Sequence, residues 1–290
     1  MNKILITGAN GYIGSHVVRS ALELCPHSHV IALDFNNSNI DSHAEYCSID
    51  ILKESNKTDL FDQLGRPDVC IHLAWKDGFN HNAGSHLDNL SNHFCFLKNM
   101  IDSGCQNISV MGTMHEIGFW EGEINEETPC NPLSLYGISK NALRQAIMSY
   151  VKNKQISMKW LRAYYITGND KLNNSVFAKI LQMASEGKKT FPFTTGLNKY
   201  DFIDVQELAT LIVLASVQNK INGIINVCSG EAISLKDKVE LFIKEKKLDI
   251  RPEYGTFPAR EYDSKECWGN TDKIKLIKRN HPNLEKEYEK

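Results

Sequence analysis

The sequence predicts an α/β fold in which a doubly wound parallel sheet carries a smaller C-terminal lobe. Short β-rich runs alternate with stretches of helical periodicity, and most of these runs are apolar throughout rather than alternately apolar and polar. Strands of this kind are buried on both faces, as in a parallel sheet covered by helices. The chain has 290 residues, which is enough for one large domain or two closely joined ones.

The first βα unit consists of a strand at 3–7 and a helix whose apolar face begins at Ile13. A long helix is expected from the segment 131–140 through Asn153. The strand and helix rhythm is lost over 168–199 and after 229. We therefore assign 1–167 plus 200–228 to the sheet domain and 168–199 plus 229–290 to the smaller lobe. Further strands are expected at 29–33, 45–49, 69–73, 108–111, 159–166 and 223–227.

Composition excludes several classes of function. Lys and Arg number 33 against 35 Asp and Glu, a balance that does not suit a nucleic-acid partner. The longest strongly apolar run, 208–217, is about half a membrane span, and no signal-like segment opens the chain, so we expect a cytoplasmic protein without a membrane partner. The 8 cysteines and 10 histidines lack metal-binding spacings such as CxxC or HExxH, so no metal is expected.

A glycine-rich turn follows the first strand directly and opens the first helix. It reads Gly8-Ala9-Asn10-Gly11-Tyr12-Ile13-Gly14, a GxxGxxG pattern. Glycines permit a tight turn and a close approach of the backbone, so a pyrophosphate can bind the free N–H groups at the positive end of the helix dipole. The alternative is that the glycines serve only the turn itself.

Two acidic residues extend this candidate nucleotide site. Asp34 ends the second strand 20 residues after Gly14, where a carboxylate can accept hydrogen bonds from both ribose hydroxyls and repel a 2′-phosphate. This favours NAD(H), with NADP(H) as the alternative. Asp50, after the third strand, is a candidate partner for the adenine amino group. Either carboxylate could instead serve only the local backbone.

The long helix places Tyr136 and Lys140 one turn apart, on the face that also carries Leu143 and Ile147. An ammonium beside a phenol favours the phenolate, so we expect Lys140 to lower the pKa of Tyr136 and make it a general acid or base. A strand ends at Thr113, 23 residues before Tyr136. Its hydroxyl could hydrogen-bond a substrate oxygen.

Together these motifs resemble the extended short-chain dehydrogenase/reductases that act on nucleotide sugars, the NAD-dependent epimerase/dehydratase group. The resemblance covers nearly the whole chain. It rests on the glycine turn, Asp34, Asp50-Ile51, His72-Leu73-Ala74, Thr113 and the run from Asn131 to Lys140, followed by Leu161-Arg162, Thr167-Gly168, 201–205, 226–231 and 260–263 before Trp268.

The resemblance implies a Rossmann-type domain holding NAD(P), a C-terminal lobe that binds a nucleoside-diphosphate sugar, and a homodimer formed through the helix of Tyr136. It implies Thr113, Tyr136 and Lys140 as the catalytic residues. The cofactor site would comprise Gly8, Gly11, Tyr12, Ile13, Gly14, Asp34, Asp50, Ile51, Leu73, Ala74, Tyr136 and Lys140. By the same matching, Asn174 and Arg260 would contact the diphosphate. Candidates for the sugar site are Trp75, Lys76, Met114, His115 and Tyr165. Trp75, Lys76 and His115 could instead be loop residues without contact to the sugar.

Three departures from the family pattern bear on the reaction. Met114-His115 replaces the Asp-Glu pair that follows the catalytic Thr in 4,6-dehydratases, so dehydration is disfavoured, although Glu116 is one position away. Tyr165 replaces a usual Asn and Tyr200 a usual Arg. Contacts to the sugar and the nucleotide must therefore differ from those of the common epimerases.

The favoured function is NAD(P)H-dependent reduction of a nucleoside-diphosphate 4-keto-6-deoxyhexose, because the segment 113–122 and the short chain resemble 4-keto-sugar reductases such as those making dTDP-fucose. Such sugars are precursors of surface polysaccharides, including lipopolysaccharide. The first alternative is an NAD-dependent 4-epimerase. The second is a protein that kept the fold and lost the chemistry, which would be expected to lose Tyr136 or Lys140.

Overall fold

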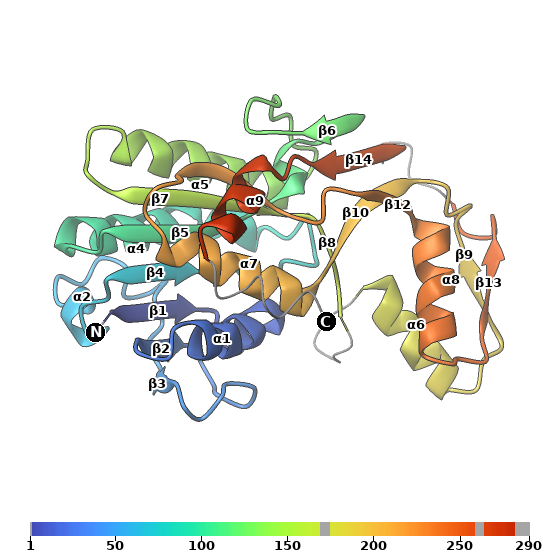
Figure 1. Ribbon diagram of the computed structural model, residues 1–290, viewed down its shortest axis with the longest axis horizontal. Helices are drawn as coiled ribbons and strands as arrows, with labels where there is room; N and C mark the ends of the chain where they lie inside the picture. Colours follow the sequence, from blue (N-terminus) through green and yellow to red (C-terminus); the bar gives the residue numbers. More distant parts are fainter. Residues whose placement is uncertain (1, 169–174, 259–263, 282–290) are drawn as a thin grey trace.

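The computed structural model describes residues 2–168, 175–258 and 264–281. Its largest element is a seven-stranded sheet of order β11-β7-β5-β4-β1-β2-β3 (Figure 1). Every neighbouring pair in this sheet is parallel, so the predicted parallel sheet is confirmed. Its strands are β1 (Lys3–Thr7), β2 (His29–Leu33), β3 (Glu45–Cys47), β4 (Val69–His72), β5 (Asn107–Thr113), β7 (Ser157–Ala163) and β11 (Gly223–Val227).

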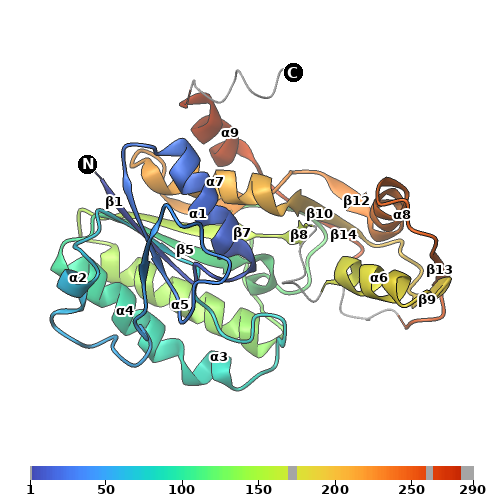
Figure 2. The same ribbon diagram turned by 90° about the horizontal axis from the view of Figure 1, so that it is seen from below.

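Helices cover both faces of this sheet (Figures 1 and 2). Alternate strand residues point to opposite faces, so Ile4 and Ile6 join one apolar core and Leu5 the other. This is the doubly wound arrangement that the sequence predicts. One face carries α1 (Tyr12–Leu24), α7 (Val205–Val217) and α9 (Asp272–Arg279); the other carries α2 (Leu60–Gln63), α4 (Leu90–Ser103) and α5 (Leu135–Val151), with α3 (Ser85–Asp88) beside α5.

The smaller lobe contains a second sheet of order β12-β10-β14-β6, with β8 also paired to β10, and a separate pair β13-β9. Its core is rich in aromatic side chains, including Phe177, Phe193 and Phe202. Its elements are β6 (Gly122–Ile124), β8 (Tyr165–Thr167), β9 (Thr190–Phe193), β10 (Lys199–Asp204), β12 (Ala232–Ser234), β13 (Arg251–Tyr254), β14 (Glu266–Gly269), α6 (Val176–Ser185) and α8 (Leu235–Glu245); the short 3-10 helix η1 (Met114–Glu116) follows β5.

Several elements differ from the sequence expectation. The strand expected at 159–166 is two strands, β7 and β8, separated at Tyr164, because the chain passes there from the large sheet to the small one. Strands β6 and β10 belong to the smaller sheet although the sequence assigns them to the larger domain. Helix α9 buries Ile274 and Ile277 in a core of the large sheet, although the sequence assigns 229–290 to the lobe. The division into two domains otherwise stays a prediction.

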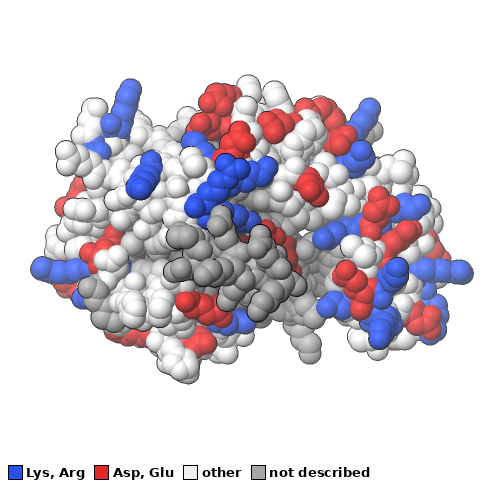
Figure 3. All heavy atoms as spheres, in the orientation of Figure 1, with Lys and Arg blue, Asp and Glu red and all other residues white. Residues whose placement is uncertain are grey.

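On the face shown in Figure 3, Lys and Arg side chains are interspersed with Asp and Glu, in keeping with the formal net charge of −2. Among the residues that the structure describes, no helix is both long and apolar enough to span a membrane. The described ranges also hold no group of three or more His, Cys, Asp or Glu side chains arranged to bind a metal ion.

Candidate active site

The glycine-rich turn packs more tightly against its neighbours than any side chain would allow. Gly8 has a φ of +70°, and a Cβ added there would lie 2.7 Å from the backbone nitrogen of Ala74. A Cβ at Gly14 would lie 1.9 Å from the carbonyl oxygen of Gly8. The N-cap of α1 is Gly11, which has no side chain to cap the helix. This cradle, with the backbone donors of the first turn of α1, fits the pyrophosphate of NAD.

Asp34 is built into this turn. Its Oδ2 accepts a hydrogen bond of 2.9 Å from the backbone nitrogen of Asn10, and its Oδ1 accepts one of 2.7 Å from that of Phe35. The Asn10 side chain in turn accepts a 2.7 Å hydrogen bond from the backbone of Asn39. A carboxylate oxygen can accept more than one hydrogen bond, so Asp34 retains acceptor capacity for ribose hydroxyls beside the glycine turn.

Asp50 makes its contacts with residues that follow it closely in the chain. Its Oδ1 accepts hydrogen bonds from the backbone nitrogens of Leu52 (3.2 Å) and Lys53 (3.3 Å), and its Oδ2 lies 3.2 Å from Lys53 Nζ. The adjacent Ile51 is buried in the core. Asp50 therefore closes a turn, and its contact with adenine stays a prediction.

The structure brings Thr113, Tyr136 and Lys140 together. Thr113 ends β5, and Tyr136 and Lys140 lie on the first two turns of α5, whose N-cap Ser134 accepts a hydrogen bond of 3.2 Å from Gly137. The helix starts directly against the segment after Thr113, since a Cβ at Gly137 would lie 2.3 Å from the carbonyl oxygen of His115. The Thr113 side chain lies near enough to the Tyr136 phenol to act on its pKa.

Burial shifts the pKa values of both Lys140 and Tyr136. Lys140 is only 2% exposed, and burial lowers its pKa to about 7. Its Nζ donates a 2.7 Å hydrogen bond to the carbonyl oxygen of Met111 and lies 3.9 Å from the ring centre of Trp75. Burial raises the pKa of Tyr136 to about 12, against the opposing effect of Thr113. The pKa of Tyr136 is therefore not lowered toward working pH as the sequence led us to expect, because desolvation of the phenol outweighs the effects of its neighbours.

A capping box fixes Thr113. Its Oγ1 accepts a hydrogen bond of 3.3 Å from the backbone nitrogen of His115, and its own backbone nitrogen donates one of 2.8 Å to Glu116 Oε1. The T-x-x-E spacing is the sequence signature of a capping box, so this role of Glu116 could have been predicted.

Glu116 is fully buried, and its carboxylate is surrounded by donors. Trp160 Nε1 donates to both oxygens, at 2.8 and 3.0 Å, and the guanidinium groups of Arg144 and Arg162 each lie 3.6 Å from Oε2. A carboxylate held in this way does not face a substrate. The structure thus strengthens the sequence argument against a dehydratase.

Histidine rings surround Tyr136. His81 stacks on the phenol at 5.3 Å and 20°, and His115 lies 6.1 Å from the phenol and 4.4 Å from His81, all measured between ring centres. The backbone nitrogen of Tyr136 donates a 2.9 Å hydrogen bond to the carbonyl oxygen of His81. The predicted residue His115 is therefore beside Tyr136. Sequence reasoning missed His81, which lies in a loop without a recognisable motif.

The other predicted substrate residues lie in different surroundings. Lys76 is exposed, and Met114 is 6% exposed within the core of the smaller lobe. Tyr165 stacks on Tyr200, with ring centres 4.3 Å apart and planes at 29°. Trp75 lies against Lys140. Asn174 and Arg260 lie outside the described residues.

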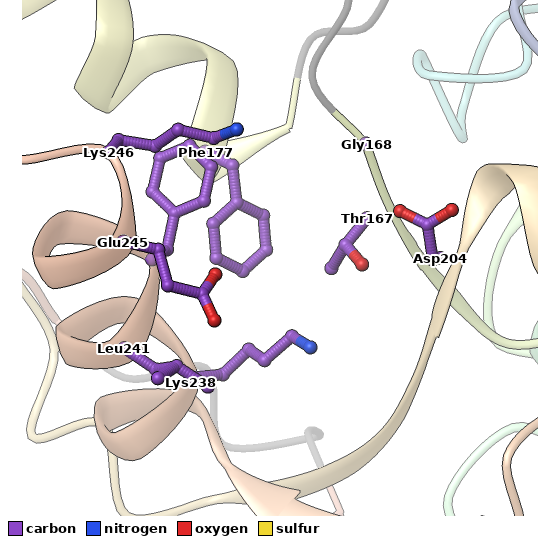
Figure 4. Close-up of a pocket in the computed structure, with 9 residues that line it drawn as sticks. Thr167, Gly168, Phe177, Asp204, Lys238, Leu241, Glu245 and Lys246 are labelled. Atoms are coloured by element: carbon purple, nitrogen blue, oxygen red, sulfur yellow. The ribbon is translucent and has the colours of Figure 1, made fainter. Parts of the chain in front are cut away.

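A pocket of about 190 Å³ lies between α8, α6 and the ends of β8 and β10 (Figure 4). Lys238 extends into it, and its Nζ lies 5.8 Å from the ring centre of Phe202. The pocket lining does not include the Thr113, Tyr136 and Lys140 side chains. It is made by Thr167, Gly168, Phe177, Asp204, Lys238, Leu241, Phe242, Glu245 and Lys246.

The parallel sheet, the glycine turn and the Tyr136 and Lys140 pair define a dinucleotide-dependent oxidoreductase. Residues 4–228 match the sequence profile of the NAD dependent epimerase/dehydratase family, and the chain belongs to this family. This confirms the resemblance, the Rossmann-type fold, the dependence on NAD and the prediction of a nucleotide-sugar oxidoreductase.

Individual relatives agree with this assignment. The chain is 45% identical over 273 residues to the dTDP-6-deoxy-L-talose 4-dehydrogenase (NAD(+)) of Aggregatibacter actinomycetemcomitans, covering 92% of this chain and 98% of that protein. It is 26% identical over 263 residues to the UDP-glucose 4-epimerase of Corynebacterium glutamicum, covering 82% and 79%. The structure of the UDP-glucose 4-epimerase of Thermotoga maritima superimposes with a TM-score of 0.80 at 22% identity, covering 94% and 91%.

Proposed function

We propose that this protein reduces the 4-keto group of a dTDP-4-keto-6-deoxyhexose with NADH. The observation that carries the proposal is the placement of Tyr136: it lies on α5 one turn before Lys140 and beside the end of β5 at Thr113. Burial raises the pKa of the phenol to about 12, so Tyr136 holds its proton until it is donated. The relative named dTDP-6-deoxy-L-talose 4-dehydrogenase (NAD(+)) supports the dTDP sugar, the position on the ring and NAD. Its named direction, oxidation of the alcohol, is the reverse of the same equilibrium.

The chemistry follows from the placement of the side chains. NADH, when bound, supplies the hydride that arrives at C4 of the sugar. The Thr113 hydroxyl and the Tyr136 phenol together bind the C4 oxygen, and Tyr136 gives this oxygen its proton, so the C=O double bond becomes a CH–OH group. The Tyr136 phenolate then regains a proton from water. The buried ammonium of Lys140 offsets the negative charge on the phenolate during this interval.

A 4-epimerase is the second candidate, because several relatives of about 25% identity carry that name. An epimerase returns the hydride to its own sugar and needs no added cofactor. The stacked Tyr165 and Tyr200, which stand where the resemblance leads us to expect Asn and Arg, count against it.

The deciding experiment measures cofactor stoichiometry. Purified protein is incubated with a dTDP-4-keto-6-deoxyhexose and NADH, and with dTDP-6-deoxy-L-talose and NAD⁺ in the reverse direction, while the NADH absorbance is followed. A reductase consumes about one NADH per keto sugar and leaves UDP-glucose unchanged. Formation of an epimer without a net change in NADH would overturn the reductase. Binding of NAD without turnover of any of these sugars would indicate a protein that has lost the chemistry.

A homodimer is part of this proposal. The side of α5 away from the core carries the small residues Ala142, Ala146 and Ser149, of which Ala146 and Ser149 are exposed in the single chain. Small residues permit close packing against a helix of a second copy. Light scattering of the purified protein tests this, and a monomer at micromolar concentration would contradict it.

A further inference from the structure

Lys140 is a buried cation whose immediate partners are not carboxylates. The acid that acts on it is Glu116, which raises the pKa of Lys140 less than burial lowers it. Within the described ranges, the contacts made by Nζ are the Met111 carbonyl oxygen at 2.7 Å and the face of the Trp75 ring at 3.9 Å. The face of an indole ring attracts a cation, and more strongly where water is excluded.

Trp75 is itself held rigidly by two histidines. Its indole stacks on the His93 ring, with centres 4.4 Å apart and planes at 14°. Its Nε1 donates a 3.0 Å hydrogen bond to His86 Nδ1, and His86 Nε2 lies 2.8 Å from the carbonyl oxygen of Asn80. An indole N–H only donates and a carbonyl only accepts, so in this pair of hydrogen bonds His86 accepts at Nδ1 and donates from Nε2.

Polar contacts between side chains connect His93 to the large sheet. His93 Nδ1 lies 3.0 Å from His72 Nε2, and His72 Nδ1 lies 2.8 Å from Thr7 Oγ1 at the end of β1. His72, His86 and His93 are each 1% exposed. A chain of packed and hydrogen-bonded side chains therefore fixes the plane of the indole against which Lys140 Nζ lies.

The indole also contacts the second catalytic residue. Its ring centre lies 6.3 Å from that of Tyr136, in an edge-to-face arrangement at 69°. A single rigid side chain thus touches both Tyr136 and Lys140. Within the chain, Trp75 contacts the catalytic pair and the two histidines, and its contact with a substrate stays a prediction.

We propose that Trp75 is a positioning residue for Lys140: its indole face holds the buried ammonium at a fixed place beside Tyr136 and favours the charged form of the lysine. The role of the site in reduction rests on the proposed function, but the effect of Trp75 on Lys140 is a property of the free protein. The two can therefore be tested separately.

The first test measures the pKa of Lys140 in the absence of cofactor and sugar. Competitive acetylation at a series of pH values, read by mass spectrometry of the peptide that contains Lys140, reports this pKa directly. We compare the wild type with Trp75→Leu, which removes the ring, and Trp75→Phe, which retains a smaller one. Trp120→Leu is the matched control, since Trp120 Nε1 binds the Glu123 carbonyl oxygen in a different part of the molecule.

The titratable groups that face Lys140 do not obscure this measurement. Burial and the charge of Lys140 hold the pKa of His93 at about 3 and that of His72 well below its usual range. The pKa of Tyr136 is about 12. Glu116 lies against two guanidinium groups. A transition near pH 7 in the reactivity of Lys140 therefore belongs to the lysine itself.

The expected result is a Lys140 pKa that falls in Trp75→Leu by about 0.4 to 1.5 units, the range that corresponds to a typical cation–π interaction. Trp75→Phe should lie between Trp75→Leu and the wild type, and Trp120→Leu should not differ from the wild type. An unchanged or raised pKa in Trp75→Leu would overturn the proposal. Circular dichroism verifies that each variant is folded. If Trp75→Leu does not fold, the comparison of Trp75→Phe with the wild type still tests the proposal.

The second test uses the pH dependence of turnover with the dTDP-4-keto sugar. One limb of the pH profile of kcat should report the ionisation of Lys140. In Trp75→Leu this limb should move to lower pH, and kcat should fall. Trp75→Phe should partly restore both the position of the limb and kcat. A loss of kcat without movement of the limb would mean a merely structural role. If the wild type turns over no such sugar, the proposed function fails, while the acetylation result still decides the role of Trp75.

Discussion

Glu116 Oε2 lies 3.6 Å from Arg162 Nη2, and both side chains are fully buried. Arg162 is on β7 and Glu116 is in η1, directly after the strand that ends at Thr113. The Glu116 carboxylate also accepts the backbone N–H of Thr113. The ion pair therefore links the position of Thr113, at the end of β5, to the neighbouring strand β7 of the large sheet.

Replacing Glu116 with Gln should destabilise the protein strongly. The amide keeps the shape and one acceptor, but it leaves the buried Arg162 guanidinium without a compensating charge. Breaking a buried pair in this way typically costs about 3–5 kcal/mol, so chemical denaturation should show a loss of that size in the free energy of unfolding. The control is Glu127→Gln, an exposed residue, which should change stability by less than about 0.5 kcal/mol. Equal stability of the two variants would contradict this interpretation.

Lys140 should make the stability of the protein depend on pH. Its pKa is lowered to about 7 in the folded state and is about 10.4 in an unfolded chain. Between these values the unfolded state binds more protons, so the free energy of unfolding rises with pH. The wild type should therefore gain up to about 1.4 kcal/mol per pH unit relative to Lys140→Met between pH 7 and 10.

Urea denaturation at several pH values measures this gain. The exposed residue Lys152 provides the control, because Lys152→Met should follow the wild type over the whole range. A constant difference between wild type and Lys140→Met from pH 7 to 10 would show that Lys140 is not deprotonated on folding.

Tyr136→Phe should abolish most of the turnover and leave the affinity for NAD nearly unchanged. The ring and its stacking on His81 at 5.3 Å are kept, and only the proton donor is lost. Loss of a positioned general acid costs about 10²-fold or more in rate. Steady-state kinetics and calorimetric titration with NAD⁺ give the two quantities. A variant that keeps more than about a tenth of wild-type turnover would remove Tyr136 from the proposed role.

The parts of the site that lie on one local element were predictable. Tyr136 and Lys140 are four residues apart on one helix, so their shared face follows from helical geometry alone. The glycine turn and Asp34 occupy fixed positions in a βα unit. The parallel order of the sheet follows from apolar strands that alternate with amphipathic helices.

The electrostatics were not predictable, because they depend on segments far apart in sequence. Burial of Lys140 requires the packing of α5 on the large sheet, and its contact with Trp75 requires a loop that follows β4. The partners of Glu116, including Arg162, come from other elements. A motif names the residues of a site, whereas the pKa of each depends on what the rest of the chain places around it.

Asp34 should set a preference for NADH over NADPH. A carboxylate repels the 2′-phosphate of NADPH and accepts hydrogen bonds from the ribose hydroxyls of NADH. Asp34→Asn is the most informative change. The amide oxygen can still accept the backbone N–H of Asn10, which lies 2.9 Å from Oδ2, while the charge and the hydrogen bond from the backbone of Phe35 are lost. The ratio of kcat/KM for NADPH to that for NADH should rise at least about fivefold, the factor that corresponds to about 1 kcal/mol of repulsion at 4 Å in water.

Asp34→Ala separates the two effects of the carboxylate. It removes both the charge and the acceptor for Asn10, so the glycine turn should loosen and affinity for both cofactors should fall, with the NADPH to NADH ratio still above that of the wild type. The exposed Asp62, which pairs with Arg66, gives the control Asp62→Asn, for which the ratio should not change. A wild-type preference for NADPH would mean that Asp34 does not face the 2′ position, and that the neighbouring Asn36 or Asn37 admits the phosphate.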